Sequence, residues 1–152
     1  MTPHVKLTVT ERNGRKCVST GSPWEPLIGY SRAVREGDFI FVTGTVGIEP
    51  DGRFGPTLKT QTRRALEIII AAIEALGGKA SDVVRTRIYV TDIAQWRDAG
   101  EVHSEYFESI RPATTMVQIA KLIDDKAMVE IEADAVVRHK HHEESSQNPA
   151  TR

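Results

Sequence analysis

The sequence predicts a two-layer α+β domain in which two helices cover one face of a mixed sheet. Three observations support this prediction. Short β-rich and longer helical segments follow one another in the order β-β-β-α-β-α-β-β, both helical segments have amphipathic spacing, and the last strand alternates apolar with acidic residues. At 152 residues the chain has the length of a single domain.

The first part of the chain is predicted to form an extension, a short strand and a hairpin. Residues 1–14 are the expected N-terminal extension, and Lys16–Thr20 is the first expected strand. The segment GSPWEPLIGY follows, and its two prolines and two glycines predict a loop without regular structure. In that loop Trp24 either packs onto the domain or lines a cleft. A hairpin is then predicted from strands at Ser31–Arg35 and Phe39–Thr45.

Two amphipathic helices are predicted on either side of a strand at Val83–Thr91. The first covers residues 58–76, where apolar side chains recur at three- and four-residue spacing until two glycines end the helix. The second covers Asp92–Ile110, with the aspartate as its N-cap. Its apolar stripe includes Trp96 and His103, so both side chains are expected to pack in the core.

The last two strands are predicted at Ala113–Ala120 and Ala127–Val137, and together they are expected to form a hairpin. Along the second strand, Glu130, Glu132 and Asp134 point to one face while the intervening apolar residues point to the other. The apolar face requires a core. The acidic face has two explanations, which are a solvated sheet surface and a site that uses a carboxylate.

The face of the sheet away from the helices is predicted to carry charged and apolar groups together. Strand parity places Val84 and Thr86 toward the helices. It places the following residues on the opposite face: Arg85, Arg87, Tyr89, Thr114, Met116, Gln118, Glu130 and Glu132. Buried charges persist only when they are paired, so a homo-oligomer with ligand clefts between its subunits is expected. The alternative is a monomer with a charged outer face.

Composition argues against several classes of function. The formal net charge of −1 gives no electrostatic footprint for nucleic acid or an anionic membrane. A single cysteine, Cys17, excludes an internal disulfide framework, and no spacing matches a zinc site. Without a signal peptide or a membrane span, a soluble cytoplasmic protein that needs no metal or cofactor is expected. The polar tail, residues 139–152, is expected to be disordered despite its histidines.

Six segments carry a family resemblance: GYSRAV, DFIFVTGTVG, QTRRALEIIIAAIEALGG, DVVRTRIYVTD, HSEYFESIRPATTMVQIAKL and VEIEADAVV. Together they span about residues 29–137 and resemble the RidA/YjgF family, also called the endoribonuclease L-PSP family. The resemblance implies a chorismate-mutase-like fold and a homotrimer whose sheets face a central barrel, with sites in the clefts between subunits. It also implies hydrolysis of reactive enamines and imines to ammonia and a carbonyl product.

The resemblance also implies candidate site residues. Tyr30 matches the family's site tyrosine, and the turn formed by Thr43, Gly44 and Thr45 matches its Ser-Gly-Gln turn. Glu130 matches the glutamate that holds the hydrolytic water. Glu130 is therefore the expected general base.

The chain departs from the family at Thr114, where deaminating members have the arginine that clamps a substrate carboxylate. Met116 stands at a position, often cysteine, whose backbone helps to place the water. A guanidinium–carboxylate pair contributes roughly 1.5–3 kcal/mol, so ordinary 2-imino acids should bind on the order of 10–100-fold less well. Arg87 is a candidate for supplying the missing cation. The alternative is that it pairs with Glu130 or Glu132.

The expected function is a RidA-like hydrolase with an altered substrate range. A second hypothesis, favoured by Thr114, is a non-catalytic homotrimer that binds a small metabolite or a partner protein in the inherited cleft. RNA cleavage, which the older family name suggests, is a third hypothesis. The balanced charge and the lack of a basic aromatic surface argue against it.

Overall fold

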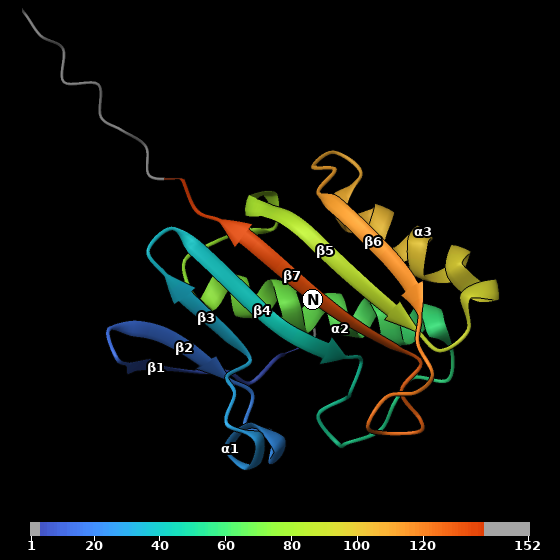
Figure 1. Cartoon of the computed structure of the whole chain (residues 1–152), viewed down its shortest axis with the longest axis horizontal. Helices are drawn as coiled ribbons and strands as arrows, with labels where there is room; N and C mark the ends of the chain where they lie inside the picture. Colours follow the sequence, from blue (N-terminus) through green and yellow to red (C-terminus); the bar gives the residue numbers. More distant parts are fainter. Residues whose placement is uncertain (1–3, 139–152) are drawn as a thin grey trace, which may run out of the picture.

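The computed structural model describes residues 4–138 and contains a seven-stranded sheet with helices packed on one face (Figure 1). The strand order is β1-β2-β3-β4-β7-β5-β6; β5 and β6 run parallel, and the other neighbours are antiparallel. The predicted α+β class with a mixed sheet is therefore confirmed. The strands are β1 Thr8–Arg12, β2 Arg15–Ser19, β3 Ala33–Glu36, β4 Phe39–Val46, β5 Val83–Val90, β6 Ala113–Gln118 and β7 Val129–Val136; the helices are α1 Trp24–Ile28, α2 Leu58–Ala75 and α3 Trp96–Phe107.

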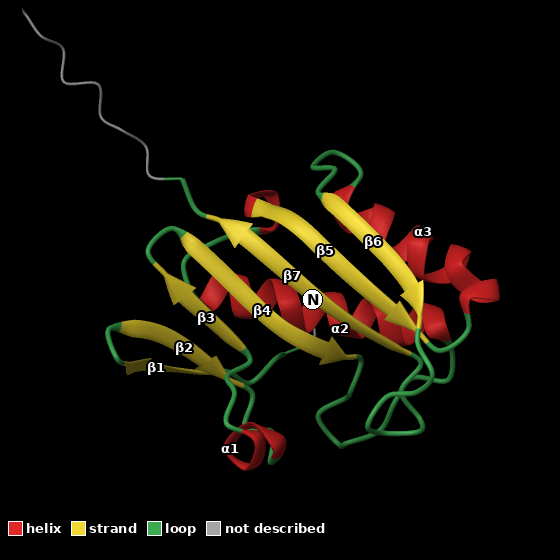
Figure 2. Cartoon of the chain, viewed as in Figure 1, coloured by secondary structure: helices red, strands yellow, loops and turns green. Residues whose placement is uncertain are grey.

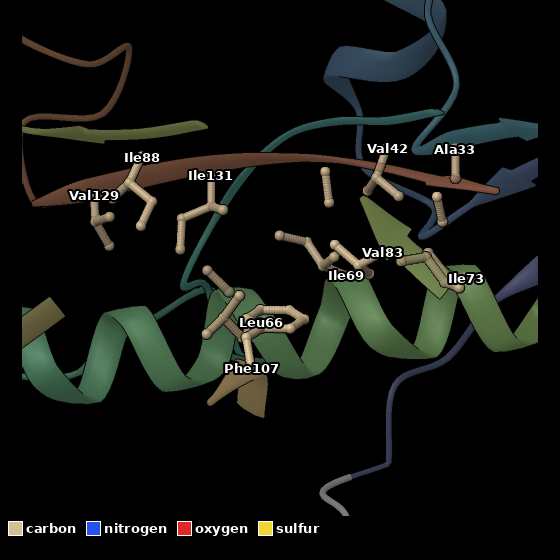
Figure 3. Close-up of a cluster of buried hydrophobic side chains, with 14 of the residues drawn as sticks. Ala33, Val42, Leu66, Ile69, Ile73, Val83, Ile88, Phe107, Val129 and Ile131 are labelled. Carbon is tan, nitrogen blue, oxygen red and sulfur yellow. The ribbon is translucent and has the colours of Figure 1, made fainter. Parts of the chain in front are cut away.

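The core lies between the sheet and the two longer helices, which both run behind the strands in Figure 2. Val129 and Ile131 of β7 point toward α2, which presents Leu66 and Ile69 to the sheet, and Phe107 of α3 lies next to Leu66 (Figure 3). Each fully buried side chain of this kind contributes about 1.5–3 kcal/mol to folding. The helices therefore leave the acidic side of β7 on the open face of the sheet.

The last two strands do not form the predicted hairpin. β7 lies between β4 and β5 and pairs antiparallel with both, while β6 pairs with the far edge of β5. The physical reason is that α3 crosses over between β5 and β6, which makes those two strands parallel. β7 then gains ladder hydrogen bonds on both of its edges in the centre of the sheet.

The N-terminal region contains more regular structure than predicted. Part of the expected extension is strand β1, which pairs with β2 across a two-residue turn at Asn13–Gly14. Both turn residues have positive φ, 52° and 75°, and Asn-Gly is the sequence that favours such a turn. The predicted irregular loop holds the one-turn helix α1, which Gly29 ends in a left-handed conformation. Trp24, at the start of α1, is 46% exposed and so only partly packed. Residues 139–152, the predicted disordered tail, lie outside the described residues.

The second predicted helix begins later and ends earlier than expected. Asp92 caps a 3-10 turn over Ile93–Gln95, and α3 then ends at Phe107. The buried side of α3 consists of Ala99, Val102 and Phe107. Trp96, the first residue of α3, is 49% exposed and lies under the Arg97 guanidinium, so its predicted place in the core is wrong.

An irregularity in β5 makes one further prediction wrong, the inward orientation of Val84. The pairing with β7 shifts between Val83 and Arg85, which buries Val83 and leaves Val84 46% exposed. Thr86 is fully buried, as predicted. His103 is partly buried, with its ring centroid 4.7 Å from that of Phe107. Within residues 4–138, no helix is long and apolar enough to cross a membrane.

Candidate active site

The cross-strand register sorts the predicted site residues onto the two faces of the sheet. Glu130 pairs with Val46 on β4 and with Tyr89 on β5, and Tyr89 in turn pairs with Val117 on β6. Side chains at directly paired positions share a face. These four therefore lie on the open face, because Ile131, the next residue along β7, is buried against the helices.

Thr114 lies on the helix-covered face, contrary to the prediction. It pairs with Thr86, whose Oγ1 is 2.8 Å from the Oγ1 of Thr114 and 2.8 Å from Nε2 of His103. Met116 and Gln118 share its parity, and Met116 packs against the core. The alternation of side chains could not predict which face of β6 points to the core, because no residue of this strand is fully buried.

Arg87 lies on the open face, where its charge is paired within its own chain. Its Nη1 is 3.3 Å from a carboxylate oxygen of Glu132 and 3.3 Å from one of Asp134. Within the described chain Arg87 and Thr114 therefore lie on opposite faces, and replacement of the missing arginine by Arg87 stays a prediction. Pairing with Glu132 was one of the alternatives.

Glu130 differs from the other two carboxylates of β7. Within residues 4–138 it forms no ion pair and accepts no hydrogen bond, and its side chain is half-buried. Burial raises the pKa of Glu130 above its ordinary value; the Arg32 charge opposes this effect and the Glu132 charge adds to it. A partly buried carboxyl with a raised pKa is suited to proton transfer near neutral pH.

The carboxyl of Glu130 rests against a bulge in β4. The register against β7 shifts here, and a Cβ at Gly44 would lie only 2.8 Å from Cδ of Glu130. Glycine is therefore the residue that permits this approach. The flanking hydroxyls bind the backbone, with Thr43 donating to the carbonyl of Ser31 and Thr45 donating to that of Thr43, each at 2.7 Å. Both threonines thus support the bulge.

Arg32 belongs to the site, although the sequence reasoning did not select it. Its Nη1 donates to the carbonyl of Gly44 at 2.8 Å and to Oγ1 of Thr45 at 3.0 Å. Its Nη2 lies 3.4 Å from the hydroxyl of Tyr30, and the guanidinium carbon is 5.6 Å from the centroid of that ring. The available signal was its position two residues after Tyr30, in GYSRAV.

The structure thus brings four predicted residues together with Arg32 and leaves other predicted residues apart. The Glu130 cluster consists of Tyr30, Arg32, Gly44, Thr45 and Glu130. Thr114 and Met116 lie on β6, which β5 separates from β7. Two strand spacings amount to about 10 Å, so these two residues do not reach Glu130 within one chain.

Comparison with known proteins places this geometry in a family. The sequence model described as endoribonuclease L-PSP matches residues 20–137, which include every member of the Glu130 cluster. The chain belongs to the endoribonuclease L-PSP family. The resemblance to RidA/YjgF proteins inferred from the sequence motifs is therefore confirmed.

Relatives within the L-PSP family cover most of the chain. The crystal structure of Rv2704 from Mycobacterium tuberculosis, a YjgF/YER057c/UK114 family member, is 50% identical with a TM-score of 0.76, covering 81% of this chain and 99% of that one. A RutC family protein from Pyrococcus abyssi is 35% identical over 123 residues, which are 80% of this chain and 96% of that one. Reactive Intermediate Deaminase A, a chloroplastic protein of Arabidopsis thaliana, is 30% identical over 138 residues, 89% and 73% of the two chains.

Proposed function

We propose that this L-PSP family member hydrolyses reactive imines and enamines, with Glu130 as the general base. The observation that carries the proposal is the state of Glu130, a half-buried carboxylate with a raised pKa and no ion pair within the described chain. The hydroxyl of Tyr30 lies next to the guanidinium of Arg32 in the same cluster, and it can orient a substrate. The name of the Arabidopsis relative, a reactive intermediate deaminase, supports the same chemistry.

The reaction requires little of the protein besides one positioned carboxylate. The carbon of a protonated imine is already electrophilic, so a water held by Glu130 attacks it while the carboxylate takes a proton from that water. The resulting carbinolamine receives this proton on its nitrogen. The C–N bond then breaks and its electron pair leaves with ammonia, while Glu130 takes the remaining hydroxyl proton, so the carbon keeps the oxygen as a carbonyl. Glu130 finally releases that proton to solvent.

The activity is tested by ammonia release from a panel of freshly generated imines, with and without a carboxylate. We expect acceleration over spontaneous hydrolysis, strongest for imines without a carboxylate because Thr114 offers no cation. The absence of acceleration across the whole panel would favour the second candidate, a non-catalytic protein that binds a metabolite in the same cleft. Thr114 is the residue that favours that candidate.

An arginine at position 114 should recover binding of carboxylate-bearing imines. Thr114 is exposed on the edge strand β6, so the longer side chain has room. For Thr114→Arg we expect kcat/KM on 2-imino acids to rise on the order of 10–100-fold, with little change for uncharged imines. Thr114→Gln is the control for side-chain length. An equal gain from glutamine, or on uncharged imines, would refute a charge-based clamp.

The proposed complete site needs a second copy of the chain, and we propose a homotrimer. The open face exposes a stacked pair, Phe39 and Phe41, at 53% and 49%, and Val117 at 42%, around the Arg87 ion pairs. Exposed apolar side chains on both sides of a set of paired charges are typical of a contact surface. Another chain can bring the β6 edge, with Thr114, to the Glu130 cluster.

The assembly is testable by sedimentation or light scattering. We expect a mass three times that of the 16.9 kDa chain, and dissociation with loss of turnover in Phe41→Lys. Val9→Lys is the matched control, because Val9 is also exposed but lies on the edge strand β1, which β2 and β3 separate from β4. A monomeric wild-type protein would instead support the charged outer face of a monomer.

A further inference from the structure

Among the described residues, Arg32 is a buried cation without a carboxylate partner. Its side chain is 8% exposed, and within residues 4–138 the guanidinium forms no ion pair. Its Nε is buried without any hydrogen-bond partner there. A buried charge left in this state is costly, so a purely structural role would be met better by a neutral side chain.

The side chain of Arg32 forms its hydrogen bonds with other members of the Glu130 cluster. Nη1 holds the carbonyl of Gly44 and the hydroxyl of Thr45, and the carboxyl of Glu130 rests on Gly44. The main chain of Arg32 is itself fixed, because its N–H donates to the carbonyl of Val18 and its carbonyl accepts from the N–H of Thr43. The guanidinium therefore has a defined position beneath the bulge.

The other charged and titratable groups around Glu130 do not replace this cation. β5 presents Tyr89 opposite Glu130, and its Arg87 is already paired with Glu132 and Asp134. On β7, the negative charge of Glu132 acts on Glu130, and Asp134 is paired with Arg87. β4 contributes Gly44 and Val46, which carry no charge, and both longer helices pack on the opposite face.

We propose that Arg32 is a positioning residue for Glu130, which it serves by fixing the Gly44–Thr45 backbone and by supplying the site's buried positive charge. The inference rests on the proposed role of Glu130 as general base. The charge stabilises the ionised carboxylate, which is the form that accepts a proton from water. It acts against burial, which favours the protonated form.

The test is the titration of Glu130 by carboxyl NMR on the full chain labelled in glutamate, with the signal identified by its loss in Glu130→Gln. Arg32→Gln keeps donors for Gly44 and Thr45 but removes the charge. We expect it to raise the pKa of Glu130 by about one unit, with the acid limb of kcat/KM moving to higher pH by the same amount. Arg32→Lys, which keeps the charge, should restore most of the wild-type titration.

Arg35→Gln is the matched control, because Arg35 also binds backbone carbonyls, those of Gly37 and Leu76, but does not act on Glu130. An unchanged pKa of Glu130 in Arg32→Gln would overturn the inference. If Arg32→Gln does not fold, the test rests on Arg32→Lys. A large rise of the Glu130 pKa in that variant would overturn the inference, because the positive charge is retained. The titration needs no substrate, so an inactive enzyme would refute the proposed function without deciding this inference.

Discussion

Replacing Glu130 by glutamine should abolish imine hydrolysis while the protein stays folded. The amide has the same shape but cannot take a proton from water, and positioned acid–base groups contribute about 10²–10⁴-fold to rate. We therefore expect kcat/KM for ammonia release to fall by that factor, toward the spontaneous rate. The measurement is the imine panel, with the wild-type protein at equal concentration.

Glu132→Gln provides the control, because Glu132 lies on the same strand and face but is paired with Arg87. It should keep most of the activity. Turnover that persists in Glu130→Gln, or that disappears equally in both variants, would remove Glu130 from the mechanism.

The substitution Glu130→Gln should not lower the stability of the fold at neutral pH. Burial raises the pKa of Glu130, so the folded chain binds its proton more tightly than the unfolded chain does. The ionised carboxylate therefore weakens the fold as pH rises through the unfolded and then the folded pKa. Glu130→Gln should melt at the same or a higher temperature at pH 7, and the difference should vanish below about pH 4.

A methyl group at Gly44 should damage catalysis more than stability. In Gly44→Ala the added Cβ would stand 2.8 Å from Cδ and 2.9 Å from Oε1 of Glu130, closer than real contacts allow. The atoms it meets belong to the far end of a side chain, so Glu130 can swing away and the backbone need not move. A displacement of about 1 Å at a reacting group can lower the rate on the order of 10²-fold. We expect a loss of this size in kcat/KM.

Gly100→Ala is the matched control for this prediction. A Cβ there meets Trp96 at 3.7 Å, which is ordinary contact, and helical alanine is favoured over glycine. It should leave turnover unchanged. Thermal melting of both variants separates the two effects: a large drop in the melting temperature of Gly44→Ala, or full activity in it, would contradict a role for the bulge in placing the carboxylate.

Much of the site could be anticipated because strand alternation is local. Glu130, Glu132 and Asp134 share a face simply because they are two residues apart, and the apolar residues between them are buried as predicted. Arg32 escaped selection because its importance depends on Gly44 and Thr45, twelve and thirteen residues later in the chain. Two errors fall where regular structure is interrupted: Trp96 is the first residue of α3, directly after a 3-10 turn, and Val84 lies at a bulge in β5.

The sequence by itself determined the α+β class, the two helices on one face, the hairpin of β3 and β4, and the family. These features rest on periodicity and on motifs that neighbouring residues carry. Only the tertiary structure decided that β7 enters between β4 and β5, that Thr114 turns toward His103, and that Glu130 is left unpaired in the described chain beside a buried Arg32. The reason is that strand order, the orientation of an edge strand and the pairing of charges depend on contacts between residues far apart in the chain.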